Sequence, residues 1–171
     1  IVGLGNIGRK LAQKALGIGL RAIASDPVQQ NPLENVPFVE FEELLATSDY
    51  ISLHVPLTDA TQHLFSTKQF SLMKPTAYLI NTARGGLIDH DALAVALDEQ
   101  QLAGAGLDVQ DPEPPDLSRP PFNDPRVIVT PHAAFMSEES LQDLRTRTTR
   151  QVATRLTGGR PENIVNPQVL D

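Results

Sequence analysis

The stretch that decides the fold comes first in the chain and reads Ile1-Val2-Gly3-Leu4-Gly5-Asn6-Ile7-Gly8. This G-x-G-x-x-G spacing is typical of a strand that turns into a helix around a dinucleotide. Gly3 allows the tight turn, Gly5 lets the backbone approach a pyrophosphate, and Gly8 lets the helix pack closely on the strand. Glycines at this spacing also occur in flexible turns, so the residues that follow must decide. Because only two residues precede the turn, we expect the chain to be a fragment of a longer protein.

The next segment completes the pattern of a nucleotide-binding unit. Residues 10–16 are predicted to be helical, two glycines end the helix, and residues 21–24 form a second strand that leads to Asp26. A carboxylate at this place accepts hydrogen bonds from the adenosine ribose hydroxyls and repels a 2′-phosphate, so Asp26 favours NAD over NADP. The alternative is that Asp26 is only a turn residue before Pro27.

Beyond residue 26, short apolar runs alternate with amphipathic stretches. This alternation predicts an α/β domain with a Rossmann-type, doubly wound parallel sheet and helices on both faces. The expected strands are residues 36–39, 50–55, 77–80, 104–109 and 127–129, and the expected helices are residues 41–47, 66–74 and 89–100. Residues 111–125 are rich in proline and irregular, and so long a segment in a compact domain is usually functional or lies at an interface.

A last helix is expected over residues 137–156, just before Gly158-Gly159. Its apolar positions predict one buried face, and its arginines predict a solvated one. The apolar positions are Leu141, Leu144, Val152 and Leu156, and the arginines are Arg145, Arg147, Arg150 and Arg155. By length, the 171 residues make a single domain.

Composition narrows the classes of function. A net charge of −7 and a pI near 5.0 argue against a nucleic-acid partner, because phosphate binding needs a basic surface. The chain has no cysteine, which excludes disulfides and thiol catalysis and fits a reducing compartment such as the cytoplasm. No apolar stretch is long enough to span a membrane. The carboxylates and histidines show no metal-ligand spacing, so we expect no metal site.

The residues that follow the predicted strands are unusually polar, and in an open parallel sheet ligands bind at that place. Arg84 follows the strand at 77–80 and suits a bidentate grip on a carboxylate. His132 follows the last strand and is a natural proton donor near neutrality, and Glu113 is placed to orient its ring. Together the three suit hydride transfer between a nicotinamide and a 2-keto or 2-hydroxy acid.

Each of these residues also has an ordinary structural interpretation. Arg84 could cap a turn, Glu113 could be a solvated residue of the proline-rich segment, and His132 could be a buried histidine. Their joint placement at successive strand ends favours the catalytic interpretation. His63 and His90 lie at helix entries away from these strand ends, and we expect both at the surface.

Several sequence blocks stand in one order along nearly the whole chain. They are Gly3-Leu4-Gly5-Asn6-Ile7-Gly8, Leu53-His54-Val55-Pro56-Leu57-Thr58, residues 79–89 around Asn81-Thr82-Ala83-Arg84-Gly85-Gly86, Gly104-Ala105-Gly106-Leu107-Asp108-Val109, Glu113-Pro114 and Thr130-Pro131-His132. With these blocks the chain resembles the D-isomer-specific 2-hydroxyacid dehydrogenases, which include phosphoglycerate, glycerate, D-lactate and formate dehydrogenases. Taken together, the blocks are far more specific than the glycine turn alone.

The resemblance implies roles for individual residues. Arg84 binds the substrate carboxylate and polarises its carbonyl, Glu113 pairs with the histidine, and His132 is the acid/base. The positions expected to line the NAD site are Gly3, Gly5, Asn6, Ile7, Gly8, Asp26, Val55, Pro56, Thr61, Thr82, Ala83, Arg84, Asp108, His132 and Ala134, with Asp108 near the nicotinamide amide. The resemblance also implies a homodimer joined through the nucleotide-binding domains. It implies as well a substrate domain, its N-terminal part absent here, to which residues 144–171 lead back.

Two departures from the family pattern concern the neighbourhood of His132. Gln110 stands where many members have an aromatic residue, and Ala133-Ala134-Phe135-Met136-Ser137 is similar to the subgroup that contains the C-terminal-binding-protein corepressors. Phe135 is therefore expected in the substrate pocket with Arg84 and His132. The alternative function is an NAD(H)-sensing, corepressor-like binding module with little turnover. The intact catalytic set favours the enzyme, because a sensor needs no proton donor.

Overall fold

The structure of the chain, a computed structural model, describes residues 1–28 and 32–170. The chain divides into two compact units, Ile1–Ala134 and Phe135–Asp171. The strands that the structure describes all lie in the first unit, which also contains the three expected catalytic residues.

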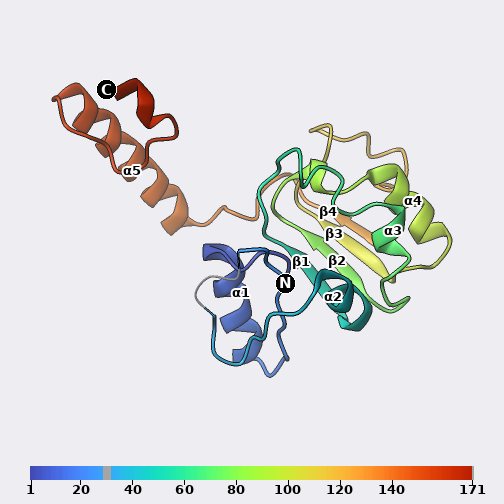
Figure 1. Ribbon diagram of the computed structural model, residues 1–171. Coiled ribbons are helices and arrows are strands. Elements are labelled where there is room, and N and C mark those ends of the chain that lie inside the picture. Colours follow the sequence, from blue (N-terminus) through green and yellow to red (C-terminus); the bar gives the residue numbers. More distant parts are fainter. Residues whose placement is uncertain (29–31, 171) are drawn as a thin grey trace. The chain divides into compact units, whose positions relative to one another are not determined.

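Four parallel strands form the sheet of the first unit (Figure 1). They are β1 (Tyr50–Leu53), β2 (Tyr78–Asn81), β3 (Gly104–Leu107) and β4 (Val127–Val129), and they lie side by side in chain order. The register pairs Leu53 with Asn81, Asn81 with Leu107, and Leu107 with Val129. The carboxyl ends of the four strands therefore meet at one edge of the sheet, which we call the rim.

The strands expected before residue 40 are present only as isolated parallel bridges. Val2 pairs with Ser25 on one side and with Leu53 of β1 on the other, and Ala24 pairs with Phe38. These pairs continue the sheet beyond β1, and they place Val2 where the strand order reverses. Such a reversal is the topological switch point at which doubly wound sheets bind nucleotides. The predicted Rossmann-type fold is confirmed.

Helices of the first unit follow the predicted pattern. They are α1 (Asn6–Gly17), α2 (Phe41–Thr47), α3 (Thr67–Phe70), the 3-10 turn η1 (Gly85–Leu87) and α4 (His90–Asp98). The α4 helix begins where the Asp89 carboxylate accepts the Ala92 N–H at 3.0 Å, a typical N-cap. The α3 helix is shorter than the expected 66–74, because the Leu72 and Met73 N–H groups bond three residues back, to Gln69 and Phe70, instead of four.

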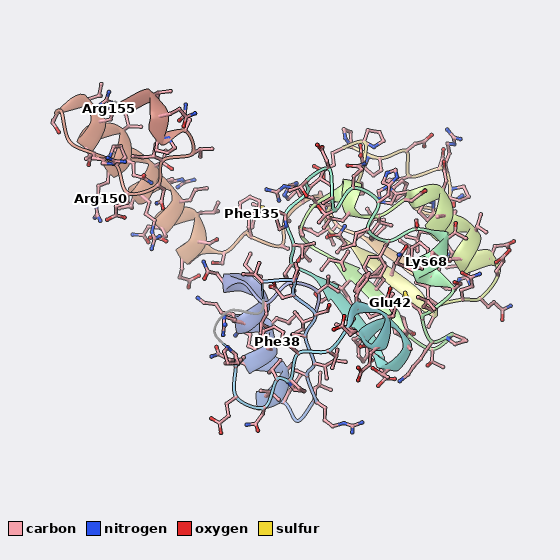
Figure 2. All side chains as sticks on the ribbon, viewed as in Figure 1. Phe38, Glu42, Lys68, Phe135, Arg150 and Arg155 are labelled. Atoms are coloured by element: carbon pink, nitrogen blue, oxygen red, sulfur yellow. The ribbon has the colours of Figure 1, made fainter. Side chains whose placement is uncertain are left out.

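Two clusters of apolar side chains make the core of the first unit. The larger joins alternate residues of the strands to α2, α3 and α4, and its fully buried members include Ile51, Leu53, Leu79, Leu93 and Phe70. The smaller packs Ala12 of α1 with Leu4, Ala22, Ala24 and Val36, and Phe38 lies against it (Figure 2). On the surface, Lys68 of α3 and Glu42 of α2 form a 3.9 Å ion pair, and an exposed pair of this kind adds little stability.

The second unit contains α5 (Glu138–Leu156) and the 3-10 turn η2 (Pro167–Leu170). The expected burial of the apolar face of α5 is wrong: no residue of the helix is buried, and Leu144, Val152 and Leu156 are 56%, 54% and 81% exposed. Leu141 is half-buried. The described part of this unit offers α5 no sheet or second long helix to pack against. The arginine side chains are exposed as predicted, and Figure 2 labels Arg150 and Arg155.

One of the two histidines expected at the surface is instead half-buried. The ring of His90 lies edge-on to Phe122, with 5.1 Å between centroids, and its Nδ1 is 3.3 Å from the Asp111 carbonyl oxygen. Burial lowers the pKa of His90. The prediction failed because Phe122 approaches α4 from the far end of the proline-rich segment. His63 is exposed, as expected.

Candidate functional site

The three positions of the first turn suit glycine for different reasons. Gly3 has a φ of +89°, and a Cβ atom there would lie 2.8 Å from the carbonyl oxygen of His54 across the switch point. A Cβ atom on Gly8 would overlap the Gly3 carbonyl oxygen. Among the described residues, a Cβ atom on Gly5 would meet nothing within 4 Å. The turn itself therefore requires Gly3 and Gly8, whereas Gly5 leaves open space where a ligand backbone could approach.

The N-terminus of α1 faces this open space without a capping side chain. In the part of the chain that the structure describes, no side chain caps the helix at Gly5, and the first turn has no acidic residue. Asn6 and Ile7, the first two residues of α1, are exposed. A helix N-terminus of this kind presents N–H groups and a positive dipole end, which suit a pyrophosphate.

Asp26 is held at the switch point by backbone N–H groups. The Leu4 N–H donates to its Oδ2 at 2.8 Å, and the Val28 N–H donates to its Oδ1 at 2.9 Å. Counting only donors among the described residues, each carboxylate oxygen keeps a further lone pair. The two oxygens can therefore accept a pair of ribose hydroxyls. The Val28 N–H bond also makes Asp26 part of the turn before Pro27, so its role at the ribose stays a prediction. With the glycine turn, Asp26 fits a dinucleotide that has a free 2′-hydroxyl.

The segment after β1 forms a closed turn. Thr61 Oγ1 donates to the Pro56 carbonyl at 2.7 Å and accepts the Thr58 N–H at 2.8 Å. Pro56 is exposed, while Val55 and Thr61 are half-buried. These hydrogen bonds fix the expected nucleotide-contacting residues of this segment to one another.

The segment after β2 carries Arg84, and a buried amide shapes it. Asn81 is fully buried at the end of β2; its Nδ2 donates to the Arg84 carbonyl at 2.8 Å, and its Oδ1 accepts the Ala83 N–H at 3.0 Å. Thr82 and Arg84 are exposed, and the Arg84 guanidinium donates to the Ala83 carbonyl. The buried amide thus sets the backbone from which the arginine projects.

The Arg84 turn lies directly against the segment that leads to Glu113. A Cβ atom on Gly85 would overlap the Gln110 carbonyl, and one on Gly86 would lie 3.3 Å from Asp111 Oδ2. Only glycine permits so close an approach of two backbones. Gly85 therefore allows two neighbouring strand ends of the rim to lie against each other.

Asp108 at the end of β3 organises the turn at residues 130–134. Its Oδ1 accepts hydrogen bonds from Thr130 Oγ1 and from the Ala133 N–H, and its Oδ2 accepts the Ala134 N–H at 2.8 Å. The side chain is 5% exposed. Burial by itself would raise the pKa of Asp108, but these hydrogen bonds outweigh burial and hold it below its ordinary value. One lone pair of Oδ2 has no donor among these contacts, so contact with a nicotinamide amide stays a prediction.

Glu113 and His132, 19 residues apart, meet at the rim. His132 Nδ1 lies 3.1 Å from Glu113 Oε2, and Glu113 Oε1 accepts the Gln110 N–H at 2.9 Å. The Gln110 N–H and the histidine both lower the pKa of Glu113. His132 has a φ of +53°, a left-handed conformation that few non-glycine residues adopt. Both side chains are partly exposed, so the pair adds little stability and mainly orients the ring.

Three polar residues that organise the rim were not among the predicted site residues. Asn81 and Thr130 follow apolar runs directly, and a polar residue at that place in a buried strand signals a structural hydrogen bond. For Gln110 the sequence shows only a departure from the family pattern. Phe135 is 52% exposed and begins the second unit, so its place in a substrate pocket stays a prediction.

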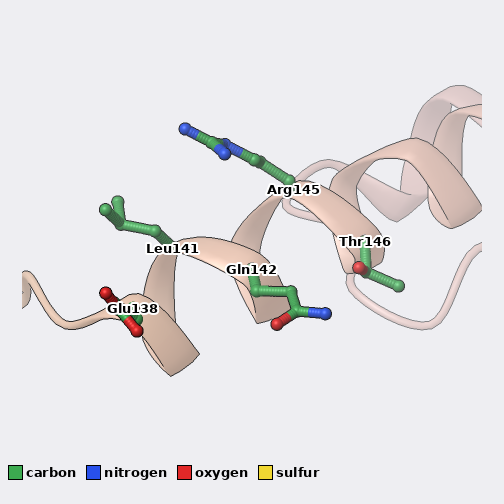
Figure 3. Close-up of a pocket in the computed structure, with 5 residues that line it drawn as sticks. All are labelled: Glu138, Leu141, Gln142, Arg145 and Thr146. Carbon is green, nitrogen blue, oxygen red and sulfur yellow. The ribbon is translucent and has the colours of Figure 1, made fainter.

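A hollow elsewhere in the molecule contains none of the predicted site residues. It is lined by Glu138, Leu141, Gln142, Arg145 and Thr146, all on α5 (Figure 3). Among the residues that the structure describes, no cluster of three His, Cys, Asp or Glu side chains could hold a metal ion. In the same part of the chain, no helix is long and apolar enough to cross a membrane.

The glycine turn, Asp26 and the doubly wound sheet define a dinucleotide-binding domain. The chain belongs to the D-isomer specific 2-hydroxyacid dehydrogenase family, and the model of that family's NAD binding domain matches residues 1–134. The match ends where the first compact unit ends. The cofactor of the domain is NAD, as predicted.

Relatives that match nearly the whole chain are named as reductases and dehydrogenases of small acids. The glyoxylate reductase of Korarchaeum cryptofilum is 42% identical over 179 residues, which cover 99% of this chain and 52% of that protein. The glycerate dehydrogenase of Methylorubrum extorquens is 40% identical over 174 residues, 96% of this chain and 51% of that protein. A D-isomer specific 2-hydroxyacid dehydrogenase from Lactobacillus delbrueckii ssp. bulgaricus, solved in its NAD complexed form, superposes with a TM-score of 0.87 at 36% identity, over 96% of this chain and 55% of that one. The chain spans about half the length of these relatives.

Proposed function

We propose that the protein to which this domain belongs transfers a hydride between NAD(H) and a D-2-hydroxy acid or its 2-keto acid. The observation that carries the proposal is the 3.1 Å contact between His132 and Glu113 at the carboxyl ends of the strands, on the same rim as Arg84. A domain that only binds a nucleotide needs no imidazole oriented by a carboxylate. Relatives named glyoxylate reductase and glycerate dehydrogenase support a small 2-keto or 2-hydroxy acid as the substrate.

The residues of the switch point would hold the cofactor. The N–H groups at the start of α1 suit the pyrophosphate, Gly5 leaves room for it, and the Asp26 carboxylate suits the ribose hydroxyls. The remaining lining positions proposed are Gly3, Asn6, Ile7, Gly8, Val55, Pro56, Thr61, Thr82, Ala83, Asp108 and Ala134. When bound, the reduced nicotinamide supplies the hydride.

Three side chains of the rim bind the substrate and transfer the proton. The Arg84 guanidinium binds the substrate carboxylate and, close to the keto oxygen, polarises the carbonyl. As the carbonyl carbon gains the hydride, the keto oxygen takes the proton from His132, and the oxidation of a hydroxy acid returns that proton to the ring. Glu113 holds the imidazole through Nδ1, which leaves Nε2 to face the substrate.

The proposed enzyme also has a substrate domain and a second subunit. Residues 144–171 lead back to a substrate domain, which closes over the rim, and Phe135 contributes to the pocket beside Arg84 and His132. Two copies form a homodimer through their nucleotide-binding domains, with the proline-rich segment at residues 111–125 as part of the contact. The protein works in the cytoplasm, which its lack of cysteine supports.

The test compares the 171-residue chain with the longer protein. We expect the chain to bind NADH but to reduce no keto acid, because a near-attack geometry needs a closed cleft. The longer protein should reduce at least one member of a panel of 2-keto acids, followed by the loss of NADH absorbance. Tight NADH binding without turnover, together with assembly that depends on nucleotide, would instead support the NAD(H)-sensing module.

A further inference from the structure

Gln110 connects the two halves of the acid/base pair. Its backbone N–H donates to Glu113 Oε1 at 2.9 Å. Its side-chain Nε2 donates to the Leu107 carbonyl at 2.9 Å and to the Thr130 carbonyl at 3.3 Å. One residue thus contacts the end of β3, the segment that carries Glu113 and the turn that carries His132.

The contact between the Gln110 amide and the Thr130 carbonyl matters because that carbonyl also holds the turn of His132. The same oxygen accepts the His132 N–H at 3.0 Å, which closes the turn that holds the histidine at a φ of +53°. A backbone conformation of this kind costs free energy and persists only where neighbouring contacts determine it. The Gln110 amide is one such contact, because it fixes the carbonyl to which the turn is tied.

The chemistry of the site selects an amide. Both neighbours of Nε2 are carbonyl oxygens, so the NH2 group must face them. The side chain is only 6% exposed, and two donated hydrogen bonds offset its burial. A purely apolar side chain such as phenylalanine could pack at this place but could not donate to the two carbonyls.

We propose that Gln110 is a positioning residue of this protein, which sets the geometry of the Glu113–His132 pair from both sides. The effect on turnover rests on the proposed function, but the geometric effect does not. Removing the side-chain donor frees the Thr130 carbonyl and loosens the backbone N–H that holds Glu113. The pair then loses its alignment, although neither catalytic residue is changed.

The experiment uses NMR of ring-labelled histidine in the 171-residue chain to measure which ring nitrogen of His132 carries the proton. Because the nitrogen that carries the proton is set by the hydrogen bond that it makes, the wild type should show mainly the Nδ1–H tautomer. Gln110→Met keeps the length of the side chain and removes the donor, and we expect it to lose most of this preference. Glu113→Ala should lose the preference as well, and the double variant should resemble Glu113→Ala alone.

Two controls separate positioning from general damage. Gln13→Met makes the same change at an exposed position of α1 and should leave the tautomer as in the wild type. Gln110→Glu keeps the shape but turns acceptors toward both carbonyls, so it gives a second measurement if the Met variant does not fold. Wild-type tautomer ratios in both Gln110 variants would overturn the proposal. So would a wild-type chain that has no preference for Nδ1–H.

The consequence for turnover is tested in the longer protein. There Gln110→Met should lower kcat about 10-fold and leave KM within about twofold, since a small misplacement of a proton donor acts on the chemical step. Gln13→Met should leave both unchanged. If the longer protein reduces no keto acid while the Gln110 variants still lose the tautomer preference, the positioning role stands and the proposed activity fails.

Discussion

Two regions of the candidate site, both in the first unit, are built in opposite ways. The nucleotide half consists of residues 3–8 and Asp26. Its shape comes from the backbone and from missing side chains: a Cβ atom on Gly3 or Gly8 would collide with the protein's own carbonyls, and Gly5 faces open space. The acid/base half consists of residues 108–113 and 130–134. Its shape comes from side-chain hydrogen bonds made by Asp108, Gln110 and Glu113.

The difference follows from what each half must bind. A pyrophosphate needs several N–H groups at close range, so any side chain between backbone and ligand is an obstacle. A proton donor must instead hold one atom in one orientation, and side-chain hydrogen bonds determine that orientation. The nucleotide half should therefore be sensitive to added atoms, and the acid/base half to removed ones.

The largest effect is expected from adding one methyl group to the nucleotide half. A Cβ atom on Gly8 would overlap the Gly3 backbone carbonyl, which cannot rotate away, so Gly8→Ala should lower the free energy of unfolding by about 3 kcal/mol. Denaturation in urea measures this. Gly5→Ala is the matched control for stability, because its φ of −74° suits alanine and nothing lies within 4 Å.

The same pair of variants separates folding from binding. Gly5→Ala should cost about 1 kcal/mol, because alanine is a poorer N-cap than glycine, well below the cost of Gly8→Ala. It should nevertheless bind NAD about 10-fold more weakly, since its new methyl group occupies the ligand's space. Calorimetric titration with NAD measures the affinity. Unchanged affinity in Gly5→Ala would mean that the open space beside Gly5 is not where the cofactor binds.

The next largest effect comes from removing the imidazole of the acid/base half. His132→Asn keeps a residue that tolerates positive φ but cannot donate the proton, and kcat in the longer protein should fall by about 10²-fold or more. His63→Asn is the control, since His63 is exposed and also has a positive φ of 50°. Equal activity in the two variants would exclude His132 as the acid/base.

The two halves also differ in how far the sequence predicts them. The glycine turn and Asp26 were recognisable because their spacing is local, and Glu113 and His132 because they follow predicted strands. The Gln110 contacts depend on a partner 20 residues away, and a linear pattern does not show which strands are neighbours. The same limit explains His90, whose ring meets Phe122.

The error on α5 has a different cause. Its period shows correctly that one face is apolar, but a period does not show whether the chain itself supplies a partner for that face. In the described residues Leu144, Val152 and Leu156 remain exposed. Burial can therefore be predicted from such a pattern only when the elements that would cover it are known.

A smaller effect is expected on the preference of the nucleotide half for NAD over NADP. Asp26→Asn keeps the shape of the side chain but removes the charge that repels a 2′-phosphate, so the preference for NAD over NADP should narrow by about 10-fold. Asp91→Asn, on the exposed first turn of α4, makes the same change of net charge and should leave the preference as it is. Calorimetric titration of each variant with both cofactors gives the two ratios.

The smallest effect is a pH dependence in the acid/base half. The hydrogen bonds from residues 130–134 hold the pKa of Asp108 below its ordinary value of 3.8, so the folded state favours the ionised form. A depressed pKa contributes stability that is fully present above the unfolded value and is lost as the pH falls through the folded one. Asp108→Asn should therefore cost about 1 kcal/mol of unfolding free energy near pH 7, the difference between hydrogen bonds to a charged group and to a neutral one. Urea denaturation of both proteins from pH 7 downward should show the difference shrinking once the pH is below about 4. Other carboxylates titrate in this range too, but they are common to both proteins and cancel in the difference. A difference that stays constant with pH would show that Asp108 holds the turn by its shape and not by its charge.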